Sequence, residues 1–200
     1  MKKLLLNIAF LFLGVLNSSS VSAPVPVIVQ SPPWNYEAEE ETETFLEAEK
    51  NAALYEKTIA FIKKHEGFAG GKPYHCVAGY LTIGYGHVIK PHERFDGRIS
   101  RAQADLLLRK DFNKCIALAE KHSENLSYNR LLAVAHFIYA KGIGRYLRSG
   151  LKKKIDSNED PETEFLKWCK YHTPEGKVVN SKYSLKIRKW EISMFKGVLK

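Results

Sequence analysis

The chain has only three cysteines and no apolar run of about 20 residues, the length that spans a bilayer. The cysteines are Cys76, Cys115 and Cys169, and their spacing matches no zinc-binding pattern. Because their number is odd, an exported chain of this kind keeps at least one unpaired thiol. Cys115 and Cys169 are equally compatible with a disulfide and with two reduced thiols. No internal repeat is present, so we expect one domain with extensions.

The first 23 residues have the pattern of a cleavable signal peptide. Two lysines precede the apolar run Leu4–Leu16, and Val21 and Ala23 occupy the small-residue positions before a cleavage point. We therefore expect an exported protein, periplasmic or secreted, that keeps no membrane span after cleavage. An uncleaved or releasable signal-anchor is the alternative.

Acidic residues are scarce after residue 50. Residues 1–50 carry three lysines and seven glutamates, whereas residues 51–200 hold 28 of the 31 Lys and Arg but 15 of the 22 Asp and Glu. The second part therefore has a net charge of +13 within the total of +9. Such a field favours encounter with a polyanion. Nucleic acid, an anionic membrane face and cell-wall polymer would all qualify, and export argues against nucleic acid.

The hydrophobic pattern predicts an α+β fold with dominant helices. Residues 24–49 are expected to form a Pro-rich and then acidic linker, whose acidic part is either disordered or the start of a helix. A helical pattern from about Phe45 to His65 ends at Gly67, and residues 74–88 predict a β-hairpin with a turn at Ala78-Gly79.

Helices are expected to fill the rest of the chain, at residues 102–119, 130–140, 162–171 and 184–195. Ser100 and Gln103 form a capping-box signature, and residues 130–140 are apolar nearly all round, as in a buried central helix. The expected architecture is a small β-hairpin lobe packed against a larger all-helical lobe, with a cleft between them.

Three parts of this sequence together resemble the phage-type lysozymes (endolysins) of glycoside hydrolase family 24. The first runs from Glu66 through Cys76 to T-I-G-Y-G-H at residues 82–87; residues 131–155 and 165–195 resemble the family's core and C-terminal blocks. The resemblance covers about residues 50–197. It implies a lysozyme-like domain at 50–200 and a bacteriolytic muramidase. Such an enzyme cuts the β-1,4 bond between N-acetylmuramic acid and N-acetylglucosamine in peptidoglycan.

The resemblance implies three catalytic residues. Glu66 is expected to be the general acid, because the negative end of the preceding helix favours a protonated carboxyl. Cys76 stands where the family often has Asp, and Thr82 is expected to position the attacking water. Nine residues, where the family has eight, separate Glu66 from Cys76, so His75 is the alternative second position. A thiol is mostly neutral at pH 7 and cannot supply the full charge of a carboxylate.

Further residues have weaker assignments. Tyr85 is a candidate for sugar stacking, and His87 is expected to pair with Asp111 and tie the hairpin to the helices. Ala140 stands where the family often has an amide side chain that faces the cleft. No metal or cofactor is implied, and we expect a monomer that binds peptidoglycan and no nucleic acid.

Two other functions are compatible with the same residues. One is a non-catalytic, cationic wall-binding or membrane-perturbing module, which the cysteine at position 76 and the alanine at position 140 keep open. The other is local wall opening by a bacterial protein, as opposed to lysis by a phage.

Overall fold

The computed structural model describes residues 36–76, 79–172 and 178–199. The predicted signal peptide and the Pro-rich part of the linker lie outside these residues. The helices are α1 (Tyr36–Glu66), α2 (Arg101–His122), α3 (Tyr128–Lys141), α4 (Ile143–Leu147), α5 (Gly150–Asp156), α6 (Glu162–Lys167) and α7 (Lys182–Phe195). The strands are β1 (Tyr74–His75), β2 (Leu81–Ile83), β3 (His87–Val88), β4 (Lys170–His172) and β5 (Val178–Asn180).

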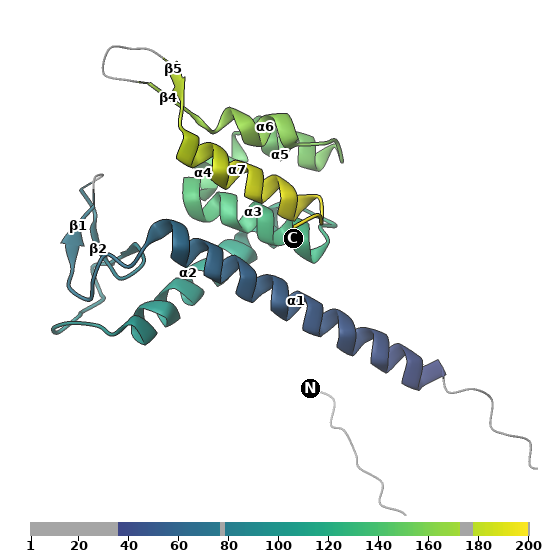
Figure 1. The fold of residues 1–200 in the computed structure, drawn as a ribbon, viewed down its shortest axis with the longest axis horizontal. Helices are drawn as coiled ribbons and strands as arrows, with labels where there is room; N and C mark the ends of the chain where they lie inside the picture. Colours follow the sequence, from purple (N-terminus) through teal and green to yellow (C-terminus); the bar gives the residue numbers. More distant parts are fainter. Residues whose placement is uncertain (1–35, 77–78, 173–177, 200) are drawn as a thin grey trace, which may run out of the picture.

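The molecule has a small β lobe beside a larger helical lobe, which confirms the α+β prediction (Figure 1). In the helical lobe α3 lies at the centre and contacts α1, α2, α4 and α7. Eight consecutive α3 residues, 131–138, are buried, as expected for a helix that is apolar on all sides. The core that fixes the site is therefore built around α3.

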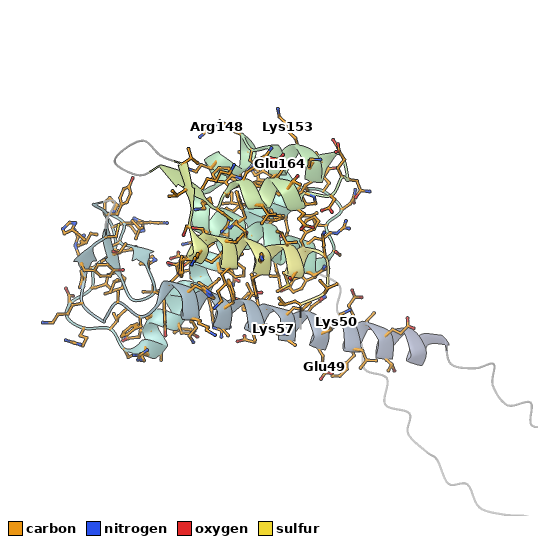
Figure 2. The ribbon with its side chains drawn as sticks, turned by 45° about the horizontal axis from the view of Figure 1, so that its top comes forward. Glu49, Lys50, Lys57, Arg148, Lys153 and Glu164 are labelled. Atoms are coloured by element: carbon orange, nitrogen blue, oxygen red, sulfur yellow. The ribbon has the colours of Figure 1, made fainter. Side chains whose placement is uncertain are left out.

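α1 begins earlier than the periodicity indicated, at Tyr36 instead of about Phe45. Glutamate favours helical conformation, so the acidic segment continues the helix without needing a buried face. Residues 41–50 are all exposed, and Figure 2 shows Glu49 on the part of α1 that extends past the helical lobe. The helix ends as predicted at Gly67, whose φ is 70° and whose N–H donates to the Lys63 carbonyl at 3.1 Å.

The β lobe has three strands where a single hairpin was predicted. β1 pairs with β2 and β2 with β3, both antiparallel. The chain turns a second time at Gly84 and Gly86, whose φ values of 67° and 90° are strained for other residues. A Cβ on Gly84 would also lie 2.8 Å from the Ala104 Cβ. Of the predicted first turn, Ala78 lies outside the described residues.

The later elements also differ in part from the prediction. The Ser100–Gln103 capping box of α2 is present in both directions, as predicted. α6 ends at Lys167, however, and the chain after it forms β4, which pairs with β5. A six-residue helix leaves too little periodic sequence to distinguish its end from the strand that follows.

A buried polar cluster joins α3 to α7. His136 Nδ1 lies 2.6 Å from Glu191 Oε1, and Arg188 Nη2 lies 3.0 Å from the same oxygen. The Arg188 guanidinium also stacks 5.1 Å from the Phe137 ring centroid. All four residues are buried, so the pairing compensates charges that would be costly alone.

Charged side chains fasten α1 to α2. Arg109 donates to both carboxylate oxygens of Glu56, at 2.6 and 2.7 Å, and to Asp105 at 2.8 Å. Asp105 also accepts from Lys63 at 2.7 Å. The two carboxylates raise the pKa of Arg109 further above its already high value. This network orients the last turns of α1, which end at Glu66.

The structure leaves Cys76, Cys115 and Cys169 as free thiols. Burial is the largest cause of a raised pKa at both Cys115, to about 12, and Cys169. A raised thiol pKa makes these two cysteines poor nucleophiles and suits a packing role.

Candidate active site

Glu66 is the last residue of α1 and is exposed. The loop that follows it is hydrogen-bonded to the turn after β2. The Ala69 N–H donates to the Gly84 carbonyl at 3.0 Å, and the Gly84 N–H donates to the Gly70 carbonyl at 3.2 Å. Only Ile83 separates Gly84 from Thr82, so this pairing holds Glu66 and Thr82 on one hydrogen-bonded unit.

Tyrosines from α3 and α7 surround the end of α1. The Tyr183 hydroxyl donates to the His65 carbonyl at 2.5 Å, and the Tyr139 hydroxyl donates to the Tyr85 carbonyl at 3.3 Å. Burial raises the pKa of both tyrosines, and the negative charge of Glu66 raises it further. Glu66 therefore stands where α1, the β lobe, α3 and α7 meet.

Thr82 is buried in the middle of β2, with 3% of its surface exposed. Its hydroxyl donates to the Tyr74 carbonyl at 3.1 Å, across the β1–β2 pair. Because a hydroxyl has one proton, the Thr82 oxygen can then only accept from a further partner. That polarity suits a residue that receives a hydrogen bond from a water molecule.

Cys76 lies at the tip of the β1–β2 hairpin, half-buried. Its N–H donates to the Tyr80 carbonyl at 2.9 Å, and its carbonyl accepts from the Gly79 N–H at 2.8 Å. The register pairs Tyr74 with Thr82. Since side chains alternate between the faces of a strand, Cys76 follows the face of Tyr74 and Thr82.

His75 points to the opposite face of the same strand. It pairs with Leu81, and both residues are exposed. Its Nδ1 lies 3.1 Å from the Gly79 carbonyl oxygen, within the hairpin tip. The pleat of the sheet thus favours Cys76 over His75 as the neighbour of Thr82.

Tyr85 belongs to the core and keeps 7% of its surface exposed. Its ring packs 5.5 Å from the Phe68 ring, and the Lys63 ammonium lies 5.7 Å from its centroid. Phe68 and Lys63 therefore contact the ring, and the sugar contact of Tyr85 stays a prediction.

His87 pairs with Asp111, as predicted. Its Nδ1 lies 2.5 Å from Asp111 Oδ2, and its Nε2 lies 2.9 Å from Glu93 Oε2. The hydrogen bond with Asp111 is the largest cause of a raised His87 pKa. Both carboxyl pKa values are lowered, that of Asp111 against its own burial and that of Glu93 mainly by the Lys90 N–H. His87 therefore ties β3 to α2 and has no free nitrogen for catalysis.

The sequence reasoning missed Glu93. It lies in the loop between β3 and α2, where hydrophobic periodicity gives no information. The available signal in the sequence is that Glu93 follows Lys90 by three residues. At this spacing the carboxylate of Glu93 accepts from the Lys90 N–H, at 2.9 Å.

Ala140 is exposed at the end of α3, beside the half-buried Lys141. Burial, followed by the nearby charge of Arg188, lowers the Lys141 pKa. A methyl group at position 140 can neither donate nor accept a hydrogen bond.

Residues 36–76, 79–172 and 178–199 form neither a metal-binding cluster nor a membrane-spanning helix. Within these ranges no three His, Cys, Asp or Glu side chains are grouped so that they could hold a metal ion. Over the same ranges no helix has the length and apolar character needed to cross a membrane.

Comparisons with known proteins agree with this geometry. The family model described as phage lysozyme matches residues 63–190. An endolysin of Acyrthosiphon pisum secondary endosymbiont phage 1 is 32% identical over 121 residues, which is 58% of this chain and 80% of that protein.

Solved structures extend the likeness to the fold. The muramidase domain of SpmX from Asticaccaulis excentricus superposes with a TM-score of 0.61 at 22% identity, over 70% of this chain and 94% of that one. The endolysin of Escherichia coli O157:H7 phage FAHEc1 gives 0.59 at 26% identity, over 70% and 90%. The family match spans more than half of the sequence and includes Glu66, Cys76 and Thr82. The chain therefore belongs to the phage lysozyme family and is a glycosidase of the muramidase type, a peptidoglycan hydrolase.

Proposed function

We propose that this enzyme cleaves the β-1,4 bond between N-acetylmuramic acid and N-acetylglucosamine, with Glu66 as the general acid. The observation that supports this most is the pairing of the loop after Glu66 with Gly84. It holds the carboxyl-bearing end of α1 against the strand that carries Thr82. A polymer bound between the lobes would meet an acid and a water-binding group held at a fixed separation.

Glu66 gives its proton to the glycosidic oxygen as the bond to the sugar carbon breaks. General acid help of this kind contributes roughly 10²–10⁴-fold to the rate. Glu66 is exposed in the free enzyme. Bound glycan would cover it and exclude water, which strengthens its interaction with the developing charge.

Thr82 and Cys76 act on the water that completes hydrolysis. The Thr82 hydroxyl proton is used by the Tyr74 carbonyl, so its oxygen accepts a hydrogen bond from that water. Cys76 shares the face of Thr82 and contributes a thiol. Water attack on the side of the sugar opposite the acid would give the inverting outcome, with the proton of that water released to solvent and Glu66 reprotonated from solvent.

The charge of the protein favours this substrate. Residues 51–200 have a net charge of +13, whereas peptidoglycan and its attached polymers carry carboxylates and phosphates. Electrostatic steering raises the rate of encounter and weakens with salt. We propose that the first 23 residues export the enzyme, that residues 50–200 form the catalytic domain, and that it acts as a monomer.

The test compares Glu66→Gln with the unchanged enzyme in a turbidity assay on purified cell walls. The amide keeps the shape of the side chain and removes the proton donor, so clearance should fall at least about 100-fold. Glu49→Gln is the matched control, because it removes one exposed charge from the same helix far from the site, and it should clear walls normally. Full activity of a folded Glu66→Gln variant would refute the assignment.

Membership of the phage lysozyme family argues against the non-catalytic wall-binding module that the thiol at position 76 and the methyl group at position 140 kept open. A wall-binding module differs from a muramidase in one observable, because a binder releases no new reducing ends. Release by the unchanged enzyme, lost in Glu66→Gln, supports the muramidase. Wall binding with no release by either protein supports the module.

A further inference from the structure

A large hollow in the described part of the molecule lies away from Glu66. It has a volume of about 970 Å³ and lies between the end of α2, the start of α3, α5 and the end of α7. Tyr183, which caps the site end of α7, is 13 residues from Lys196 in the hollow. At about 1.5 Å per residue this corresponds to about 20 Å along the helix. We call this hollow the distal groove.

The walls of the distal groove are fixed by contacts between its elements. The Asn129 amide donates to the Met194 and Phe195 carbonyls at 3.0 and 3.1 Å, which joins α3 to the end of α7. The Arg130 guanidinium lies 5.1 Å from the Phe195 ring centroid. A pocket that is already formed in the free protein binds a ligand without a free-energy cost for ordering its walls.

Some charges of the distal groove are already paired. Lys152 contacts Asp156 at 2.5 Å on α5, and Lys196 contacts Asp160 at 3.2 Å. Within each pair the two charges cancel, so these four residues add little net charge to the groove. They therefore contribute shape and hydrogen bonding more than attraction.

Other charges of the groove have no such partner. Among the described residues, Lys121, Arg130 and Glu124 form no ion pair, and all three line the groove. Asn125 and Asn158 line it too, in left-handed conformations with φ of 56° and 53° after α2 and α5. Helix-end geometry explains their backbone and leaves their side-chain amides for a ligand.

We propose that the distal groove binds the peptide stem of peptidoglycan. Two unpaired cations, one unpaired carboxylate and two amides suit a short peptide that carries several carboxylates and an amine. A polymer with negative charge alone would meet the unpaired carboxylate of Glu124 as a repulsive neighbour. The inference rests on the proposed function, because a wall hydrolase meets glycan and stems together. Two sites on one polymer raise its effective concentration at the catalytic site.

The experiment measures sedimentation of the full chain with intact peptidoglycan and with glycan from which an amidase has removed the stems. The Lys121→Gln/Arg130→Gln variant removes the unpaired cations. Lys57→Gln/Lys110→Gln is the control, since it removes two exposed cations elsewhere, also without ion-pair partners in the described chain. We expect the unchanged enzyme to bind intact wall about tenfold more tightly than stripped glycan, equivalent to about 1.4 kcal/mol.

The groove variant should bind both polymers equally, and the control should keep the preference for intact wall. The proposal is overturned if the groove variant keeps the tenfold ratio. It is also overturned if both variants lose affinity equally on both polymers, because that result indicates general attraction to a polyanion. Reducing ends released from stripped glycan by the unchanged enzyme test the proposed function separately, so the two failures are distinguishable.

Discussion

Replacing Asp111 by Asn should destabilise the enzyme more than it slows it. Asp111 Oδ2 lies 2.5 Å from His87 Nδ1, and His87 is 4% exposed at the junction of β3 and α2. The asparagine oxygen can still accept from the ring, so the variant loses the charge and keeps the shape. Neither residue touches the Glu66 region, so the chemistry should be little affected.

The magnitude follows from the kind of bond that is lost. A hydrogen bond to a charged group contributes about 1.5–3 kcal/mol, against about 0.5–1.5 kcal/mol for a neutral one. Asp111 is partly exposed, with 23% of its side chain accessible, and Glu93 remains on the other ring nitrogen at 2.9 Å. We therefore expect a loss of about 1–2 kcal/mol, or about 2–8 °C in Tm for a chain of this length.

The stability that His87 gains from Asp111 and Glu93 falls both at high pH and at low pH. The His87 pKa is raised, so its share is present below the unfolded-state value and is lost as pH rises through the folded value. The Asp111 and Glu93 pKa values are lowered, so their shares are present above the unfolded-state values and are lost as pH falls. The His87–Asp111 pair therefore contributes most to stability at mildly acid pH, between the ordinary pKa ranges of carboxyl groups and imidazole.

Thermal unfolding followed from pH 4 to pH 8 measures this directly. The difference in Tm between the unchanged enzyme and Asp111→Asn should be largest near pH 5–6 and smaller at both ends. Lys114→Met is the control: Lys114 contacts Asp111 at 2.9 Å but is 44% exposed, and exposed pairs contribute little. An Asp111→Asn variant of unchanged Tm and greatly reduced activity would refute a structural role for the pair.

Two further predictions concern the ends of α1 and β1. Deleting residues 1–49 should change Tm by less than about 2 °C and keep wall clearance, because residues 41–49 are exposed; a large loss would place the domain boundary earlier. Cys76→Asp should raise turnover several-fold in reducing-end assays, because a carboxylate supplies charge that a thiol lacks. His75→Asp puts the same charge on the opposite face and should not raise turnover; equal gains from both would show that the face is irrelevant.

The elements with strong local signals were predictable from the sequence. The apolar run at 130–140, the Ser100–Gln103 capping box and Gly67 after α1 each fix their own conformation. The His87–Asp111 pair was also predictable, although only through the resemblance to a family. In these places local preference and tertiary packing agree.

Other features depend on contacts that a sequence does not display. The third strand requires a turn at Gly84, whose position against Ala104 comes from α2 packing on the β lobe. Glu93 reaches His87 from an irregular loop. β4 and β5 have three residues each, which is too few for an alternating pattern to be recognised in the sequence. Tyr85 was assigned by its neighbours in sequence, whereas its burial is decided by Phe68 and Lys63.

Mass spectrometry of wall fragments tests the central claim most directly. Digestion by the unchanged enzyme should release fragments whose new reducing end is N-acetylmuramic acid, and Glu66→Gln should release essentially none. Fragments that end in N-acetylglucosamine would assign the other glycosidic bond. An anhydro sugar end would show transglycosylation, and the same fragments from Glu66→Gln would remove Glu66 from the chemistry.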